Sequence, residues 1–160
     1  MPFRLALTTL ALIALALLAG PALAADHDAV VKAQLESKGT PFTIDDDGDF
    51  QITVRVDDKR TQLVWVRSAV ESTDHHKVRE IWSPGYRTPT GNFTPAIAND
   101  LLERSNNLKL GAWVKQDDVA MLVIKIPADA SADALDEAIA LPTDFTACWW
   151  SKNRCRARWS

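Results

Sequence analysis

The sequence predicts an α+β fold: an antiparallel twisted sheet of about five strands with helices on one face, in the order α-β-β-β-α-β-β-α. Three observations support this fold class. Several segments alternate apolar and polar residues with the period of two that is typical of strands. The links between them are of hairpin length, which favours antiparallel pairing. Three other segments carry helix caps and helix stops.

The first 25 residues precede the predicted fold and read as a secretory signal peptide. Arg4 supplies an early positive charge, Leu5–Ala19 is an apolar run, and small residues surround Ala24 and Ala25. The run of roughly 15 residues is shorter than the ~20 that span a bilayer, which argues against an uncleaved anchor. Cleavage is therefore expected after Ala24 or Ala25, with a periplasmic or secreted product.

The expected organisation is a signal peptide at 1–25, one α+β domain at 26–141 and a Trp- and Arg-rich tail at 142–160. Cleavage leaves roughly 135 residues, enough for a single domain with its own core. Arg4 is the only charged residue removed, so the formal net charge changes from −3 to −4. A mildly acidic chain gives no reason to expect nucleic-acid binding.

The first half of the domain predicts one helix followed by three strands. The helix runs from Asp26 to Lys38, with Asp26 or Asp28 as its cap and Gly39 as its stop. Asp47–Gly48 is expected to form a two-residue hairpin turn, because both residue types tolerate positive φ. The strands are expected at 50–57, 62–68 and, more weakly, 77–82.

The second half begins with a predicted loop over Ser83–Gly91, rich in Pro and Gly. Thr94 should cap the next helix, with Pro95 at its first position. Ser131 should cap the last helix, which Pro142 is expected to end. Two strands are expected between these helices, at 108–114 and 119–126.

The core prediction follows from the alternating and doubly apolar positions of these elements. It comprises Phe50, Ile52, Val54, Val64, Val66, Leu101, Leu102, Leu110, Val123 and Ile126.

Four sequence blocks, with the acidic hairpin at Asp47–Asp49, resemble the YbjN-type domain family, described as bacterial sensory transduction regulators. The blocks are Val78–Pro84, Leu101–Asn106, Lys109–Trp113 and Ile126–Ala130. The resemblance covers about Val31 to Ile139. It implies the fold of type III secretion chaperones and a non-catalytic role in protein binding or regulation, and it leaves a dimer open. It brings no catalytic residues.

The chain departs from that family after Leu141, where the last helix should continue with alanines and acidic residues. Instead the tail alternates cations with tryptophans, a composition that suits weak contact with an anionic membrane or an unstructured end. Cys148 and Cys155 could form a disulfide only if the tail is not helical, because seven helical positions separate Cα atoms by ~10.5 Å. The candidate membrane contacts are Trp149, Trp150, Arg154, Arg156 and Arg158.

Two clusters suggest a small metal-binding protein as the alternative function. Asp45–Asp49 gathers carboxylates around a glycine, but its spacing does not match a calcium loop. His75 and His76 are adjacent, so on a strand they would point to opposite faces; in a loop they could share a metal with His27. Solvation of exposed turns is the preferred explanation of both clusters, and no cofactor is expected.

No nucleophile motif or phosphate-binding loop is present, so an enzyme is not expected. Tryptophans on strands serve either as core or as anchors of a protein interface. The preferred hypothesis is an exported, chaperone-like module that binds another protein through its sheet face and the Trp82–Thr94 loop. The candidate partner-binding residues are Trp65, Trp82, Tyr86 and Trp113.

Overall fold

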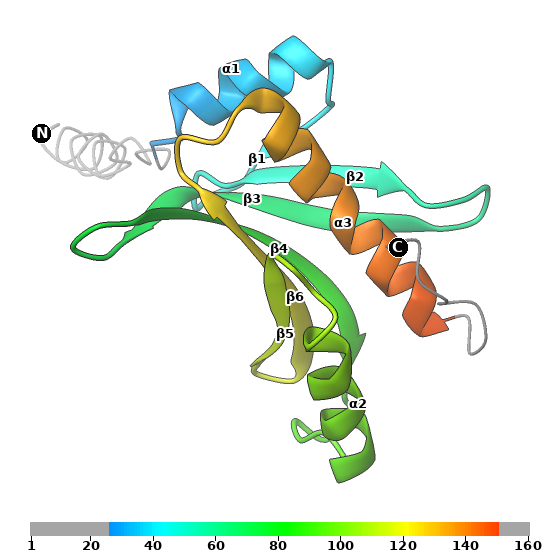
Figure 1. Ribbon diagram of the computed structural model, residues 1–160. Helices are drawn as coiled ribbons and strands as arrows, with labels where there is room; N and C mark the ends of the chain where they lie inside the picture. The colour runs from blue at the N-terminus through cyan, green and yellow to red at the C-terminus, as the bar shows by residue number, and fades with distance from the viewer. Residues whose placement is uncertain (1–25, 151–160) are drawn as a thin grey trace, which may run out of the picture.

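The computed structural model describes residues 26–150, with side chains to residue 143, and shows an α+β domain (Figure 1). The described segment contains one antiparallel sheet with strand order β1-β2-β3-β4-β6-β5 and three helices. The predicted fold class is confirmed. The sheet has six strands rather than about five, because β1, only two residues long, pairs with β2. The strands are β1 (Thr43–Ile44), β2 (Phe50–Arg55), β3 (Thr61–Ser72), β4 (Lys77–Arg87), β5 (Gly111–Gln116) and β6 (Val119–Pro127).

The helices begin at the caps that the sequence predicts. Helix α1 (Ala29–Lys38) is capped by Asp28, whose carboxylate accepts hydrogen bonds from two backbone amides, and it ends at Gly39 with φ of 66°. Helix α2 (Pro95–Ser105) is capped by Thr94 with proline at its first position. Helix α3 (Ala132–Trp150) follows Ser131, whose hydroxyl accepts from the Ala134 N–H.

Helices α1 and α3 cover one face of the sheet at one end, and α2 packs beside β5 at the other (Figure 1). The covered face, which we call the core face, presents Phe50, Val64 and Ile81 from three neighbouring strands. Val31 and Leu35 of α1 and three residues of α3 are buried in the same cluster. The α3 residues are Leu135, Ala138 and Ile139.

The core prediction is correct at most positions and wrong at two. Leu102 and Leu110 are 66% and 46% exposed, because α2 turns Leu101 rather than Leu102 toward the sheet and Leu110 precedes β5. Val54 is only partly buried against the cluster. The predicted residues that are buried are Phe50, Ile52, Val64, Val66, Leu101, Val123 and Ile126.

The predicted loop over Ser83–Gly91 is wrong in its first half, because β4 continues to Arg87. Pro84 lies opposite Met121 within the sheet, and the register shifts between Pro84 and Tyr86. A bulge accommodates a residue without an N–H. The Gln62 side chain donates a hydrogen bond to the Pro84 carbonyl at 2.7 Å, so this carbonyl has a partner where the register shifts.

Two further local predictions need correction. Pro142 does not end the last helix: α3 continues to Trp150, and Pro142 is itself buried inside it. The predicted two-residue turn is a wider hairpin loop, in which the Gly48 N–H donates to the Asp45 carbonyl. Only Gly48 has positive φ there, 82°, while the Asp45 carboxylate accepts from the amides of Asp47 and Asp49.

Candidate interaction surface

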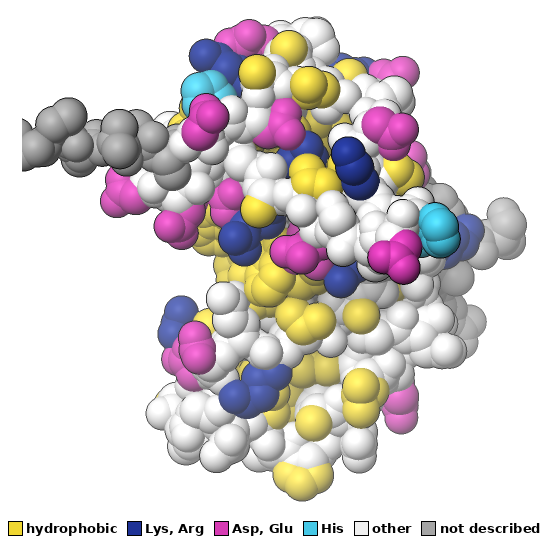
Figure 2. Space-filling view, turned by 90° about the vertical axis from the view of Figure 1, so that its left-hand side faces the viewer, with side chains coloured by type: hydrophobic (Ala, Val, Ile, Leu, Met, Phe, Trp, Pro, Cys, Tyr) yellow, Lys and Arg dark blue, Asp and Glu magenta, His cyan; other side chains and the backbone are white. Residues whose placement is uncertain are grey.

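The sheet face opposite the core face carries an apolar surface on which none of the described helices packs. We call it the open face. Figure 2 looks at the left-hand side of Figure 1 and shows hydrophobic side chains gathered in a hollow, with basic and acidic side chains at its margins. Strand alternation and register place these apolar residues on the open face: Leu63, Trp65, Trp82, Pro84, Ala112, Val114, Met121 and Val123.

Trp65 and Trp82 lie directly opposite each other on neighbouring strands. The same row continues through Val123 of β6 to Ala112 of β5. Both indoles are half-buried, whereas Val123 between them and the sheet edge is only 2% exposed. Two large rings therefore lie side by side, next to a floor of small apolar side chains, an arrangement that can hold another apolar group.

Charged side chains fix the Trp82 ring within this row. The indole N–H donates to Glu80 at 2.9 Å, and Glu80 also pairs with Lys125 at 2.9 Å. The Arg67 guanidinium lies over the ring, 5.8 Å from its centroid. Burial acts to raise the pKa of Glu80, but Lys125, the indole and Arg67 outweigh it, so the pKa lies below its ordinary value. Glu80 is therefore ionised at neutral pH and holds the ring in place.

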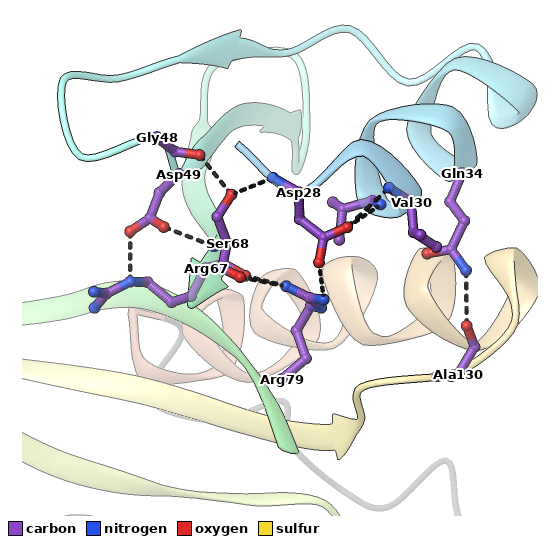
Figure 3. A network of polar contacts seen from close by, with 10 residues as sticks. Asp28, Val30, Gln34, Gly48, Asp49, Arg67, Ser68, Arg79 and Ala130 are labelled. Carbon is purple, nitrogen blue, oxygen red and sulfur yellow. Dashed lines mark hydrogen bonds and ion pairs between the residues drawn. The ribbon is translucent and has the colours of Figure 1, made fainter. Parts of the chain in front are cut away.

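A buried polar network fastens α1 to the sheet behind this surface (Figure 3). Arg79, 3% exposed, pairs with the Asp28 carboxylate at 2.5 Å and donates to the carbonyls of Arg67 and Ser68. These carbonyls lie where the register of β3 and β4 shifts, between Val66 and Val70. The Arg79 guanidinium thus donates hydrogen bonds to the backbone carbonyls that the register shift leaves without partners in the sheet.

Asp49 completes the network on the open-face side. Its carboxylate accepts from the Ser68 N–H at 2.7 Å and forms an ion pair with Arg67. The Ser68 hydroxyl bridges the Gly48 carbonyl and the Asp28 N–H. The irregular part of β3 is therefore held from both sides, and Arg67 is positioned over Trp82.

The structure separates the four tryptophan and tyrosine candidates into two groups. Trp65 and Trp82 lie together on the open face. Trp113, 8% exposed, belongs to the core face, and Tyr86 packs against the same cluster with its ring 6.0 Å from that of Phe93. The alternation of side chains along the strands explains this separation. Trp113 pairs with Leu122, which is one residue away from the row that contains Trp82, so Trp113 points to the opposite face.

The metal-site candidates are engaged elsewhere or lie in turns. Asp45 caps its own loop, and Asp49 binds Arg67 and a backbone amide. His75 and His76 occupy the exposed turn between β3 and β4, which Thr73 closes through both backbone and hydroxyl. Within residues 26–143, no three His, Cys, Asp or Glu side chains are grouped so that they could hold a metal ion.

The membrane-contact candidates fall outside the described side chains. Trp149 and Trp150 are on the last turn of α3, and Arg154, Arg156, Arg158 and Cys155 follow it. None of the helices between residues 26 and 150 is long and apolar enough to cross a membrane.

Sequence reasoning missed the charged residues that frame the open face, namely Arg67, Glu80 and Lys125. Each stands in an alternating strand at a position that reads simply as polar. The alternation of side chains along a strand was the available signal. Arg67 lies two residues from Trp65, and Glu80 lies two residues from Trp82, so each charged side chain shares a face with its tryptophan.

No protein-family profile, curated protein or solved structure matches the chain significantly.

Proposed function

We propose that this protein is an exported, non-catalytic module that binds another protein through the open face, in a chaperone-like or regulatory role. The observation that carries the proposal is the apolar row through Trp65, Trp82 and Val123, on which no described helix packs. A contiguous apolar surface rimmed by polar residues is typical of protein interaction sites.

The chemistry of the row supports a protein as the bound species. Tryptophan anchors dominate the energetics of protein interfaces when they sit in a preformed, well-packed setting. Trp82 meets this condition, because Glu80 and Arg67 already hold its ring. The resemblance to the YbjN-type family agrees with binding rather than catalysis, and the signal-like leader agrees with a periplasmic or secreted site of action.

A pull-down from periplasmic extract with three forms of the mature protein tests the proposal. The forms are the unaltered chain, the double variant Trp65→Ala/Trp82→Ala, and Leu102→Ala as the control. Leu102 is the matched control because it is an exposed large apolar residue on α2, at 66%. We expect the same partner with the unaltered chain and the control, and at least a tenfold loss with the double variant.

Thermal melting of each form must accompany the pull-down, so that lost binding is not confused with lost folding. Equal recovery by all three folded forms would place binding elsewhere and contradict the proposal. Recovery of no partner, with an activity that depends on His75 or His76, would favour an enzyme.

A further inference from the structure

We infer that the leader must be cut off before the domain folds, because the packed structure begins too close to the cut. The chain then crosses the membrane unfolded. This inference rests on the export that is part of the proposed function, and it sets the order of the steps. It follows from the few residues after the expected cut, which lies behind Ala24 or Ala25.

The folded domain fixes Asp28 to the sheet through both its backbone and its side chain (Figure 3). The Asp28 N–H donates to the hydroxyl of Ser68 on β3 at 3.1 Å, and the carboxylate pairs with Arg79 on β4 at 2.5 Å. These partners lie 40 and 51 positions further along the chain, so the contacts exist only after the sheet has formed.

The residue before Asp28 is packed as well. The ring of His27 is half-buried and meets the ring of Phe50 edge-on, with 6.0 Å between the centroids. Phe50 is itself fully buried in the core. Between Ala25 and the packed part of the chain stands only Asp26, which is exposed.

A peptidase needs more free chain than one residue. An extended peptide is bound in a cleft through its backbone on both sides of the bond that reacts. The bond after Ala25 is separated from the Asp28 amide by at most roughly 10 Å of extended chain. The folded domain would therefore meet the walls of the cleft, and the residues after the bond could not extend without leaving the sheet.

Local opening of the folded domain does not remove this obstacle. Release of Asp28 would leave Arg79, 3% exposed, without its carboxylate, and a buried charge without a partner is strongly unfavourable. It would also remove the cap of α1. Cutting that waits for a rarely opened form is slow in proportion to its small population. The productive order is therefore crossing, cutting and then folding.

The test treats three forms of the full precursor, residues 1–160, with purified signal peptidase in detergent micelles. The first form is the unaltered, folded chain. The second, Ile81→Asp, puts a charge at a fully buried core position and should be unfolded. The third, the spaced form, carries six Gly and Ser residues between Asp26 and His27, which keeps both candidate bonds and moves the domain away. Circular dichroism shows which forms are folded.

We expect the unfolded form and the spaced form to be cut at least tenfold faster than the unaltered precursor. The matched control carries the same six residues in the exposed turn between Asp74 and His75, far along the chain from the cut. It should be cut at a rate within twofold of the unaltered precursor, because the distance from the bond to the domain is unchanged.

The outcomes separate this inference from the proposed function. Equal rates for the unaltered precursor and Ile81→Asp would overturn the inference and leave the proposed function standing. A spaced form that is folded and cut as slowly as the unaltered precursor would overturn it too, because distance from the domain would not be the cause. If no form were cut, the leader itself and the proposed export would be contradicted. A pull-down that the tryptophans do not affect would contradict only the proposed binding surface.

Discussion

At the scale of single residues, the carboxylate of Asp28 both caps a helix and forms a tertiary contact. It accepts from the amides of Val30 and Val31 and pairs with the buried Arg79. Burial acts to raise the pKa of Asp28, but the Val31 amide and Arg79 outweigh it, so the pKa lies below its ordinary value of 3.8. The charged form is the one that the fold stabilises.

This depressed pKa predicts a loss of stability in acid. A carboxyl whose pKa is lower in the folded state contributes stability above the unfolded value, near 3.8, and loses it as pH falls through the folded value. We expect Asp28→Asn to be less stable than the unaltered chain at pH 7 in urea, and the difference to shrink below about pH 3.8. A difference that is constant from pH 7 to pH 3 would show that the charge plays no part.

At the scale of elements, a glycine lets the Trp113 ring of β5 reach across β6 onto β4. Gly85 lies at the bulge of β4, beneath the Trp113 ring of β5 on the core face. A Cβ atom at Gly85 would lie 2.3 Å from Cζ3 of Trp113. The indole can cover the sheet there only while residue 85 has no side chain.

Gly85→Ala should therefore destabilise the domain by about 1–3 kcal/mol, the usual effect of overpacking a core. Trp113→Leu removes the clashing ring, so the same glycine substitution should be much less harmful in that background. Urea unfolding of the four forms measures the coupling. Additive effects would mean that Gly85 is needed for some other reason.

The last helix gives a second prediction at this scale. Pro142 is buried within α3, so truncation after Leu141 removes part of the packed structure. We expect the melting temperature to fall by at least about 4 °C, on the order of 1 kcal/mol for a domain of this size. Truncation after Trp150, which keeps all of α3, is the control. Equal losses in the two forms would contradict a contribution from the end of α3.

At the scale of the whole molecule, the two sheet faces differ in what packs on them. The core face holds the helices and the cluster around Phe50, Ile81 and Leu135. The open face is apolar in the middle and carries charged side chains of both signs at its ends. Under the proposed function, stability and recognition lie on opposite sides of one sheet, and we expect that the tryptophan pair can be altered with little effect on the core.

Export is the prediction that concerns the whole chain. The leader should be removed when the full chain is expressed with its natural N-terminus, leaving Ala25 or Asp26 as the first residue. Intact-mass measurement of the periplasmic fraction identifies the cut. Ala24→Asp should slow processing or shift it, because the cleavage site needs small residues. Recovery of the full chain from Met1 in the cytoplasm alone would contradict export.

Features that depend on neighbouring residues could be predicted from the sequence. The caps Thr94 and Ser131, and Asp28 as one of two candidates, can be predicted because capping is a contact within one helical turn. The α+β class followed from periodicity, which reports how each segment buries one side.

Which faces meet depends on contacts between segments that are distant in the sequence. The sequence could not show that α3 passes through Pro142, because burial of the ring offsets the missing hydrogen bond. It also could not separate Trp113 in the core from Trp65 and Trp82 on the open face. All three lie on strands with alternating apolar residues. Strand pairing and the placement of the helices together determine which set of alternate side chains is covered.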